Sequence, residues 1–219
     1  MKLMDFDGLF DEKLSQYMEE NKGKYTEKQW ENIIPRLYQK FGDTYVAKVK
    51  CTPKEYYARM TDEELTATLS VHLKEQIPVP DFLCCEIEGR NCTEALLSLL
   101  KSDDGETVSY AINLVGADER AFPDYFSMIT ENKFDEDIRD AAVEKLKENA
   151  DKATEAALKF YKEGTAKEYM LEILSRAKKR DEGIFRILLD EFLSDVGRVP
   201  MHAGYLAAYG DERALPYLM

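Results

Sequence analysis

The chain has 219 residues, a formal net charge of −13 at pH 7, and few glycines and prolines (11 and 7). This composition disfavours disordered, collagen-like and turn-rich β-sandwich proteins, and the length permits one elongated domain or two small ones. The acidic excess disfavours nucleic acid as a partner, because binding a phosphate backbone requires clustered Lys and Arg. Residues 1–10 lack a basic start followed by an apolar run, and no stretch reaches the ~20 apolar residues of a membrane span. We therefore expect a cytoplasmic protein with no membrane partner.

The first 89 residues carry clear helix-start signals. Thr26, Thr52 and Thr61 are each followed three residues later by Gln or Glu, the pattern in which the two side chains cap each other's backbone N–H groups. Apolar residues then recur at helical spacing, as in residues 65–73. Pro78 and Pro80 cannot continue a helix. We predict an N-terminal helical region over residues 1–89 that caps helical repeats over residues 90–219.

An internal repeat organises the second region. Residues 118–123 read Asp-Glu-Arg-Ala-Phe-Pro and residues 211–216 read Asp-Glu-Arg-Ala-Leu-Pro, so the two copies begin 93 residues apart, or three units of 31. A period of this size is typical of stacked helix pairs. We predict outer helices at 93–100, 119–131, 152–163 and 182–194, inner helices at 106–115, 135–149, 165–179 and 198–209, and a last outer helix at 212–219. In this last helix Leu215 and Leu218 are expected to face the core, and it either caps the stack or precedes further chain.

These motifs resemble a known family of repeats. Gly-Asp-Glu-Arg-Ala-Leu-Pro-Tyr-Leu at 210–218 resembles the turn and outer helix of HEAT-like repeats of the phycobilisome-lyase type, and Asp-Ile-Arg-Asp-Ala-Ala at 137–142 resembles their inner helix. The resemblance covers about residues 93–219 and implies an all-α fold, an α-solenoid of HEAT-like helix pairs. Residues 165–194 depart from the pattern, because Tyr169, Met170 and Leu171 replace the small residues. Such repeats serve many functions, so the resemblance predicts a fold and not an activity.

Cysteine and histidine offer few sites for chemistry. We expect the cysteines at positions 51, 84, 85 and 92 to be free buried thiols. A zinc site made by Cys51, His72, Cys84 and Cys92 is the alternative, although adjacent cysteines on a helix point about 100° apart. His72 lies on an apolar helix and is expected to be a partly buried, hydrogen-bonded side chain rather than a base. We expect no metal and no cofactor.

The basic side chains have structural explanations. Arg139 is expected to form a salt bridge with an acidic turn residue of the neighbouring repeat. The run Lys178-Lys179-Arg180 is expected to end an inner helix, where positive charge complements the helix dipole.

The predicted inner helices carry the candidate binding residues. Tyrosine offers a large contact area with a polar tip, which suits binding surfaces. The candidate partner-binding residues are Tyr110, Asn113, Tyr169, His202, Tyr205 and Tyr209.

The usual catalytic motifs, such as a Gly-rich phosphate loop or a nucleophile elbow, are missing from the sequence. We therefore predict no catalytic residues and a non-enzymatic interaction module that binds a protein or peptide on the concave face of the solenoid. The alternative is an enzyme, either a bilin lyase-like protein, as the name of the family implies, or a DNA glycosylase-like protein, which would need a basic groove.

Overall fold

The chain is helical in both of its parts. The computed structural model describes residues 3–90, 92–131, 133–194 and 196–219, and within these ranges the only β pairing is an isolated bridge between Val46 and Cys51. The chain divides into two compact units, Met1–Leu99 and Leu100–Met219. Among the described residues, no helix combines the length and apolar content needed to cross a lipid bilayer.

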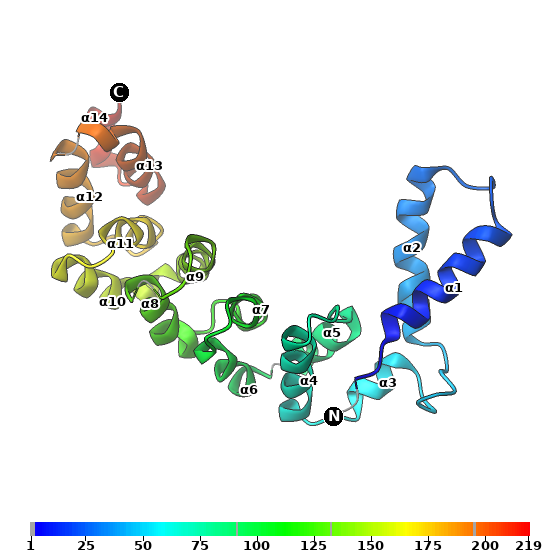
Figure 1. The fold of residues 1–219 in the computed structure, drawn as a ribbon. Helices are drawn as coiled ribbons and strands as arrows, with labels where there is room; N and C mark the ends of the chain where they lie inside the picture. Colours follow the sequence, from blue (N-terminus) through cyan, green and yellow to red (C-terminus); the bar gives the residue numbers. More distant parts are fainter. Residues whose placement is uncertain (1–2, 91, 132, 195) are drawn as a thin grey trace. The chain divides into compact units, whose positions relative to one another are not determined.

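The first unit holds six α-helices among its described residues. They are α1 (Phe6–Glu20), α2 (Glu27–Gly42), α3 (Pro53–Ala58), α4 (Asp62–Lys74), α5 (Asp81–Arg90) and α6 (Thr93–Leu97) (Figure 1). The three predicted capping boxes are confirmed, since Thr26, Thr52 and Thr61 each exchange side-chain and backbone hydrogen bonds with the residue three positions on. The sequence predicts that residues 93–100 belong to the repeats, but helix α6 contacts α4 and lies in the first unit.

Aromatic side chains form much of the core of the first unit. Tyr38 and Phe82 stack with their ring centroids 4.5 Å apart, and the hydroxyl of Tyr38 donates to Oδ1 of Asp7 at 2.7 Å. Burial is the main cause that raises the pKa of Asp7. At the end of α5, Arg90 donates to the carbonyl oxygens of Met60 and Ala58 at 2.6 and 2.5 Å. These bonds tie α5 to the end of α3.

The second unit is a series of paired helices. They are α7 (Gly105–Val115), α8 (Phe122–Thr130), α9 (Glu136–Glu148), α10 (Ala150–Glu163), α11 (Lys167–Leu174), α12 (Glu182–Ser194), α13 (Val199–Tyr209) and α14 (Leu215–Leu218). Helix α8 pairs with α9, α10 with α11, and α12 with α13. The odd-numbered helices also contact one another in succession, from α7 to α9, α11 and α13 (Figure 1).

The two copies of the sequence motif adopt the same local structure. In each, an aspartate caps a single 3₁₀ turn and holds the arginine two residues on: Asp118 accepts from Arg120, and Asp211 accepts from Arg213. In each, proline stands at the start of the α-helix that follows. The repeat in the sequence is therefore also a repeat in conformation.

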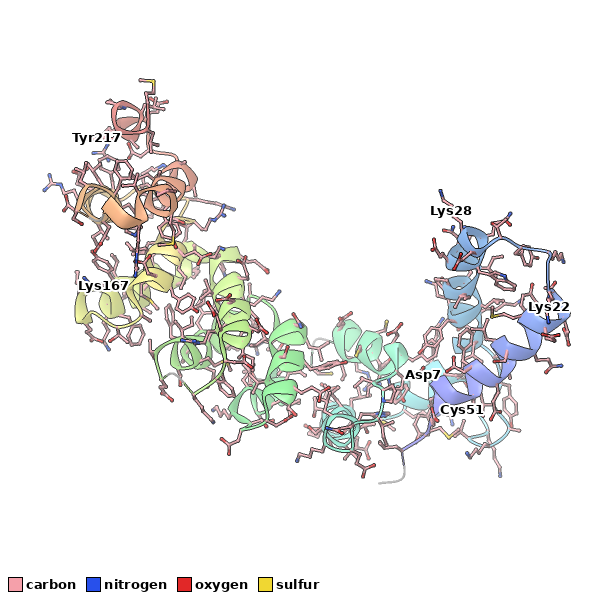
Figure 2. The ribbon with its side chains drawn as sticks, turned by 45° about the horizontal axis from the view of Figure 1, so that its top comes forward. Asp7, Lys22, Lys28, Cys51, Lys167 and Tyr217 are labelled. Atoms are coloured by element: carbon pink, nitrogen blue, oxygen red, sulfur yellow. The ribbon has the colours of Figure 1, made fainter. Side chains whose placement is uncertain are left out.

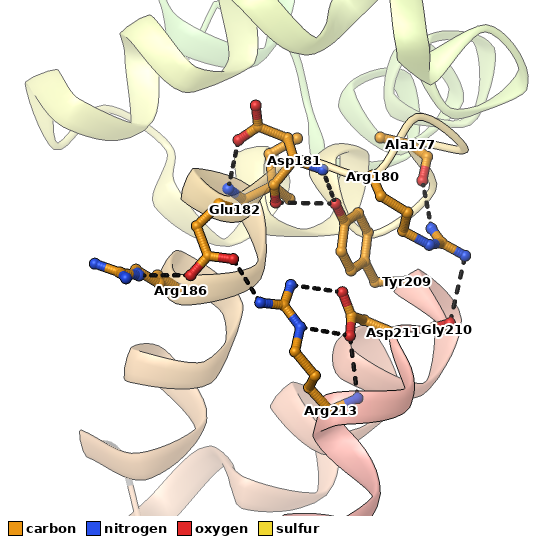
Figure 3. Close-up of polar contacts among 10 residues, drawn as sticks. Ala177, Arg180, Asp181, Glu182, Arg186, Tyr209, Gly210, Asp211 and Arg213 are labelled. Carbon is orange, nitrogen blue, oxygen red and sulfur yellow. Dashed lines mark hydrogen bonds and ion pairs between the residues drawn. The ribbon is translucent and has the colours of Figure 1, made fainter.

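A network of polar contacts joins the turn before α12 to the turn after α13 (Figure 3). The Tyr209 hydroxyl accepts from the backbone N–H of Asp181 at 2.7 Å and donates to the carbonyl of the same residue at 3.2 Å. Arg213 bridges Glu182 and Asp211. Tyr209 lies 28 positions after Asp181, and Arg213 lies 31 positions after Glu182. Both separations are close to the period of the sequence motif.

Three expectations for this unit are wrong. The inner helix predicted at 165–179 ends at Leu174, so Lys178 and Lys179 lie in a turn, where their backbone N–H groups donate to Asp151 at 2.8 and 2.9 Å. Arg139 forms no ion pair with a described residue, and its guanidinium instead lies 5.8 Å from the ring centroid of Tyr169 on the neighbouring helix. Leu215 does not face the core, since 55% of its surface is exposed and no described helix covers it.

His72 and the cysteines also differ from expectation. His72 is buried on the apolar side of α4, and neither ring nitrogen has a hydrogen-bond partner among the described residues, because its neighbours along that side include Leu69 and Leu73. The four thiols are free, as expected, but Cys85 is exposed and Cys84 is half-buried. Burial raises the pKa of Cys84 and of Cys92 to about 11. Both thiols therefore keep their protons at neutral pH, the form that is weakly nucleophilic.

Candidate interaction face on the inner helices

Tyr169 joins two neighbouring helices of the second unit. It lies on α11, is half-buried, and has the guanidinium of Arg139 from α9 over its ring. Burial, followed by a hydrogen bond to Asp140, raises the pKa of its hydroxyl. A cation over a tyrosine face is attractive because of the ring quadrupole. The two groups from α9 therefore fix the position of the Tyr169 ring.

A second link between α9 and α11 is ionic. Lys147 Nζ lies 2.6 Å from both Glu144 Oε1 and Glu172 Oε1, and only 11% of the Lys147 side chain is exposed. Its pKa is raised although burial opposes the charge, because two carboxylates accept its protons. Breaking this arrangement by removing one partner would leave a largely buried charge.

The third group of contacts joins α11 to α13. Glu168 pairs with Arg198 through Oε1, while its Oε2 lies 3.4 Å from Nε2 of the buried His202. Nδ1 of His202 lies 3.0 Å from the carbonyl of Glu191. A carbonyl can only accept, so Nδ1 of His202 donates to it, while neither Nε2 of His202 nor Oε2 of Glu168 has a hydrogen-bond partner among the described residues.

Tyr205 lies next to this pair. Its ring centroid is 6.0 Å from that of His202, and the side chain is half-buried. Burial, followed by the charges of Glu172 and Glu168, raises its pKa to about 12. The hydroxyl thus remains a neutral hydrogen-bond donor at physiological pH.

The contacts run continuously from α9 through α11 to α13. We call the inner face the set formed by Arg139, Asp140, Glu144, Lys147, Glu168, Tyr169, Glu172, Arg198, His202 and Tyr205. The structure brings three of the candidate residues into this set: Tyr169, His202 and Tyr205.

The other candidates lie elsewhere. Tyr110 and Asn113 are on α7, outside the helices that carry the set, and are half-buried and exposed, respectively. Tyr209 is 1% exposed and its hydroxyl is bound to Asp181. Its position is that of a packing residue between two turns.

Sequence reasoning missed the charged members of the inner face. Glu168 and Glu172 stand four residues apart on one helix and so lie on the same side of it. Arg198 follows Glu168 by 30 residues, one period of the repeat. The repeat period could have been used to predict that Glu168 and Arg198 are close, because residues one period apart occupy adjacent helix pairs.

The described residues hold no group of three or more His, Cys, Asp or Glu side chains placed to bind a metal ion, so Cys51, His72, Cys84 and Cys92 are not gathered into the alternative zinc site.

The first unit contains a groove with a volume of about 780 Å³ beside the stacked rings of Tyr38 and Phe82. Its charged lining mixes both signs: Arg36, Lys40 and Lys54 against Asp43, Asp81 and Glu86.

No protein-family model, curated protein or solved structure matches the chain. The functional argument therefore starts from the inner face.

Proposed function

We propose that residues 100–219 form a short α-solenoid of HEAT-like helix pairs and act as a non-enzymatic interaction module, with the inner face as its concave binding surface for a segment of a partner protein. The succession of contacts between α7, α9, α11 and α13 supports the stacked arrangement. The observation that carries the binding proposal is the pair of half-buried tyrosines on adjacent inner helices: Tyr169, with the guanidinium of Arg139 over its ring, and Tyr205, beside the ring of His202.

Tyrosines held in this way suit recognition. An aromatic ring that is already ordered loses little conformational freedom when a partner binds, so more of its contact area contributes to affinity. The raised pKa values keep both hydroxyls protonated and neutral. Each tyrosine therefore presents an uncharged, largely apolar ring, with the Tyr169 hydroxyl already hydrogen-bonded to Asp140.

The charge of the inner face indicates the chemistry of the partner. The face carries four acidic side chains against three permanently cationic ones, and the whole chain has a net charge of −13. An acidic surface of this kind accelerates association with a cationic partner and disfavours an acidic one. The proposed partner segment is therefore basic or amphipathic.

The proposal can be tested by comparing captured proteins across variants. The intact chain, Tyr169→Ala and Tyr205→Ala are used as bait in a lysate of the native cell, and bound proteins are identified by mass spectrometry. Tyr45→Ala is the matched control, because Tyr45 is an exposed tyrosine (63%) in the first unit. We expect one protein to be retained by the wild type and by Tyr45→Ala and lost from both inner-face variants.

The captured protein is then reduced to a synthetic segment and its affinity measured by fluorescence anisotropy. We expect each inner-face substitution to weaken binding by about tenfold or more, and salt to weaken it further. Equal affinity for the wild type and both variants would refute the proposal. Covalent uptake of a bilin by the chain on incubation would instead support the lyase-like alternative.

A further inference from the structure

An apolar groove lies between α1 and α2 in the first unit. It has a volume of about 180 Å³, and its apolar lining consists of Phe10, Leu14 and Tyr17 of α1 with Leu37 and Phe41 of α2. Phe10 and Phe41 are buried, whereas the other three side chains are half-buried. Part of the apolar lining of this α1–α2 groove is therefore exposed.

Contacts between the two helices hold the groove in place. The hydroxyl of Tyr38 on α2 donates to Oδ1 of Asp7, which is labelled in Figure 2, at 2.7 Å. The ring centroid of Phe10 lies 4.9 Å from that of Tyr38 and 5.7 Å from that of Phe41. Because these contacts lie within the chain, the groove is formed before any partner binds, which lowers the cost of binding.

The charged side chains of the groove are cationic. They are Lys13 of α1 and Lys40 of α2, and none of the described residues that line the groove is acidic. Both lysines are exposed, and neither forms an ion pair with a described residue. Nζ of Lys13 lies 5.1 Å from the ring centroid of Phe41, so this ammonium reaches from α1 to α2. The groove thus combines apolar surface with two positive charges that lack a counter-charge.

The sequence places the lysines in the groove by the same spacing in both helices. Each helix has an apolar residue, a lysine three positions later and an apolar residue directly after the lysine. These residues are Phe10, Lys13 and Leu14 in α1, and Leu37, Lys40 and Phe41 in α2. Residues three and four positions apart lie on one side of a helix, whereas direct neighbours and next neighbours do not. The acidic residues at positions 11 and 12 therefore fall outside the groove.

We propose that the α1–α2 groove binds an acidic, amphipathic segment of a partner protein, with an apolar side chain between the helices and carboxylates beside Lys13 and Lys40. Charge complementarity favours an acidic partner over a basic one. The volume favours a protein segment, because pockets that enclose a drug-sized molecule measure roughly 300–1,000 Å³, whereas about 180 Å³ suits one or two side chains. The groove and the inner face thus select partners of opposite charge.

The negative charge of the whole chain does not remove this preference. Screening at physiological salt reduces interactions between exposed charges that are more than about 8 Å apart. The two lysines beside the bound segment therefore act on it more strongly than distant carboxylates do.

The proposal is tested by selecting peptides from a random library displayed on phage. The intact chain and its double variant Lys13→Glu/Lys40→Glu are used in parallel. We expect the wild type to enrich peptides in which leucine, isoleucine or phenylalanine is flanked by aspartate or glutamate. We expect the double variant to lose these peptides, because it replaces two attractions by two repulsions.

The most enriched acidic peptide is then synthesised with a fluorescent label, and its affinity is measured by fluorescence anisotropy. The double variant is expected to weaken binding by about tenfold or more. Leu37→Ser is expected to weaken it by about fivefold or more, because it removes apolar contact area from the groove.

Lys28→Glu is the matched control. Lys28, labelled in Figure 2, is also an exposed lysine of α2 but does not line the groove. We expect this variant to keep the wild-type affinity within about twofold. Circular dichroism is expected to show that the lysine variants remain folded, because exposed side chains are replaced.

Three results would overturn the proposal: no enrichment of acidic peptides, an affinity that the double variant leaves unchanged, or a dimer of the wild-type chain that the double variant dissociates in sedimentation equilibrium. Enrichment of basic peptides alone counts as the first result, because it indicates binding at the inner face. A dimer that the double variant dissociates would assign the groove to a second copy of the chain.

Discussion

The two motif copies share their local chemistry and differ in their surroundings. Asp118 and Asp211 hold their arginines with the same set of hydrogen bonds, and the alanines that follow, Ala121 and Ala214, are both buried. One residue later the copies diverge, at Phe122 and Leu215. The comparison teaches that six residues are enough to set a turn, whereas the burial of the helix after it depends on which helices pack against it.

The largest expected difference in stability between the two copies is at Phe122 and Leu215. Phe122→Ala should lower the free energy of unfolding by about 3–5 kcal/mol, because it removes a buried ring and leaves a cavity. Leu215→Ala should lower it by less than about 1 kcal/mol, since the side chain is mostly exposed. Urea denaturation measures both. As a control, Ala121→Leu and Ala214→Leu should lower the free energy of unfolding by similar amounts, because both positions are closely packed. Equal losses of unfolding free energy in Phe122→Ala and Leu215→Ala would contradict the comparison.

The carbonyl groups of the two helix-ending glycines give the next difference. The Gly116 oxygen accepts from the Tyr125 hydroxyl at 2.8 Å, and the Gly210 oxygen accepts from Arg180 at 3.4 Å. Tyr125→Phe should cost about 1–1.5 kcal/mol, because it removes the hydroxyl that pairs with the carbonyl. Arg180→Ala should cost under about 1 kcal/mol, because its hydrogen bonds to the carbonyls of Ala177 and Gly210 are long, at 3.2 and 3.4 Å, and the second is exposed. Thermal denaturation of the two variants would rank them, and the reverse order would show that solvent already satisfies the Gly116 carbonyl.

Titration sharpens the comparison of the two aspartates. The hydrogen bond from Arg213 lowers the pKa of Asp211 to about 2, and that from Arg120 lowers the pKa of Asp118. A lowered pKa in the folded state stabilises the protein above the unfolded value of about 4, and this stabilisation is lost as the pH falls towards about 2. Asp211→Asn should therefore lower Tm by up to about 3 °C at pH 7, with a smaller deficit near pH 2.5. Scanning calorimetry at several pH values tests this, and a deficit independent of pH would refute it.

The smallest effect on stability is expected for the ion pair that joins Glu119 of the first motif copy to Lys152 on α10. Lys152 and Glu119 are both more than half exposed, so Lys152→Met should change the free energy of unfolding by at most about 0.5 kcal/mol, and less in high salt. Urea denaturation at low and high salt measures the change. A loss above about 1 kcal/mol would mean that this exposed pair contributes as much as a buried one.

The comparison also separates what the sequence determined by itself from what needed the tertiary structure. The capping boxes at Thr26, Thr52 and Thr61 were predictable because each involves two residues three positions apart. The period of the motif and the starts of most helices in the second unit were predictable for a similar reason, since turns and helix ends are set by neighbours in the chain.

The contacts of the inner face and the exposure of Leu215 were decided by packing. Nothing near Arg139 in the chain predicts that it lies over Tyr169, 30 residues away, and nothing in residues 211–216 predicts that Leu215 is exposed while Phe122 is buried. His72 is predicted to be hydrogen-bonded, and it is buried without a hydrogen-bond partner in the part of the chain that the structure describes. The sequence alone determined where helices begin and that units recur, because those properties depend on local hydrogen bonds. Only the tertiary structure decided which side chains meet, because burial and ion pairing depend on helices that lie about one repeat apart in the chain.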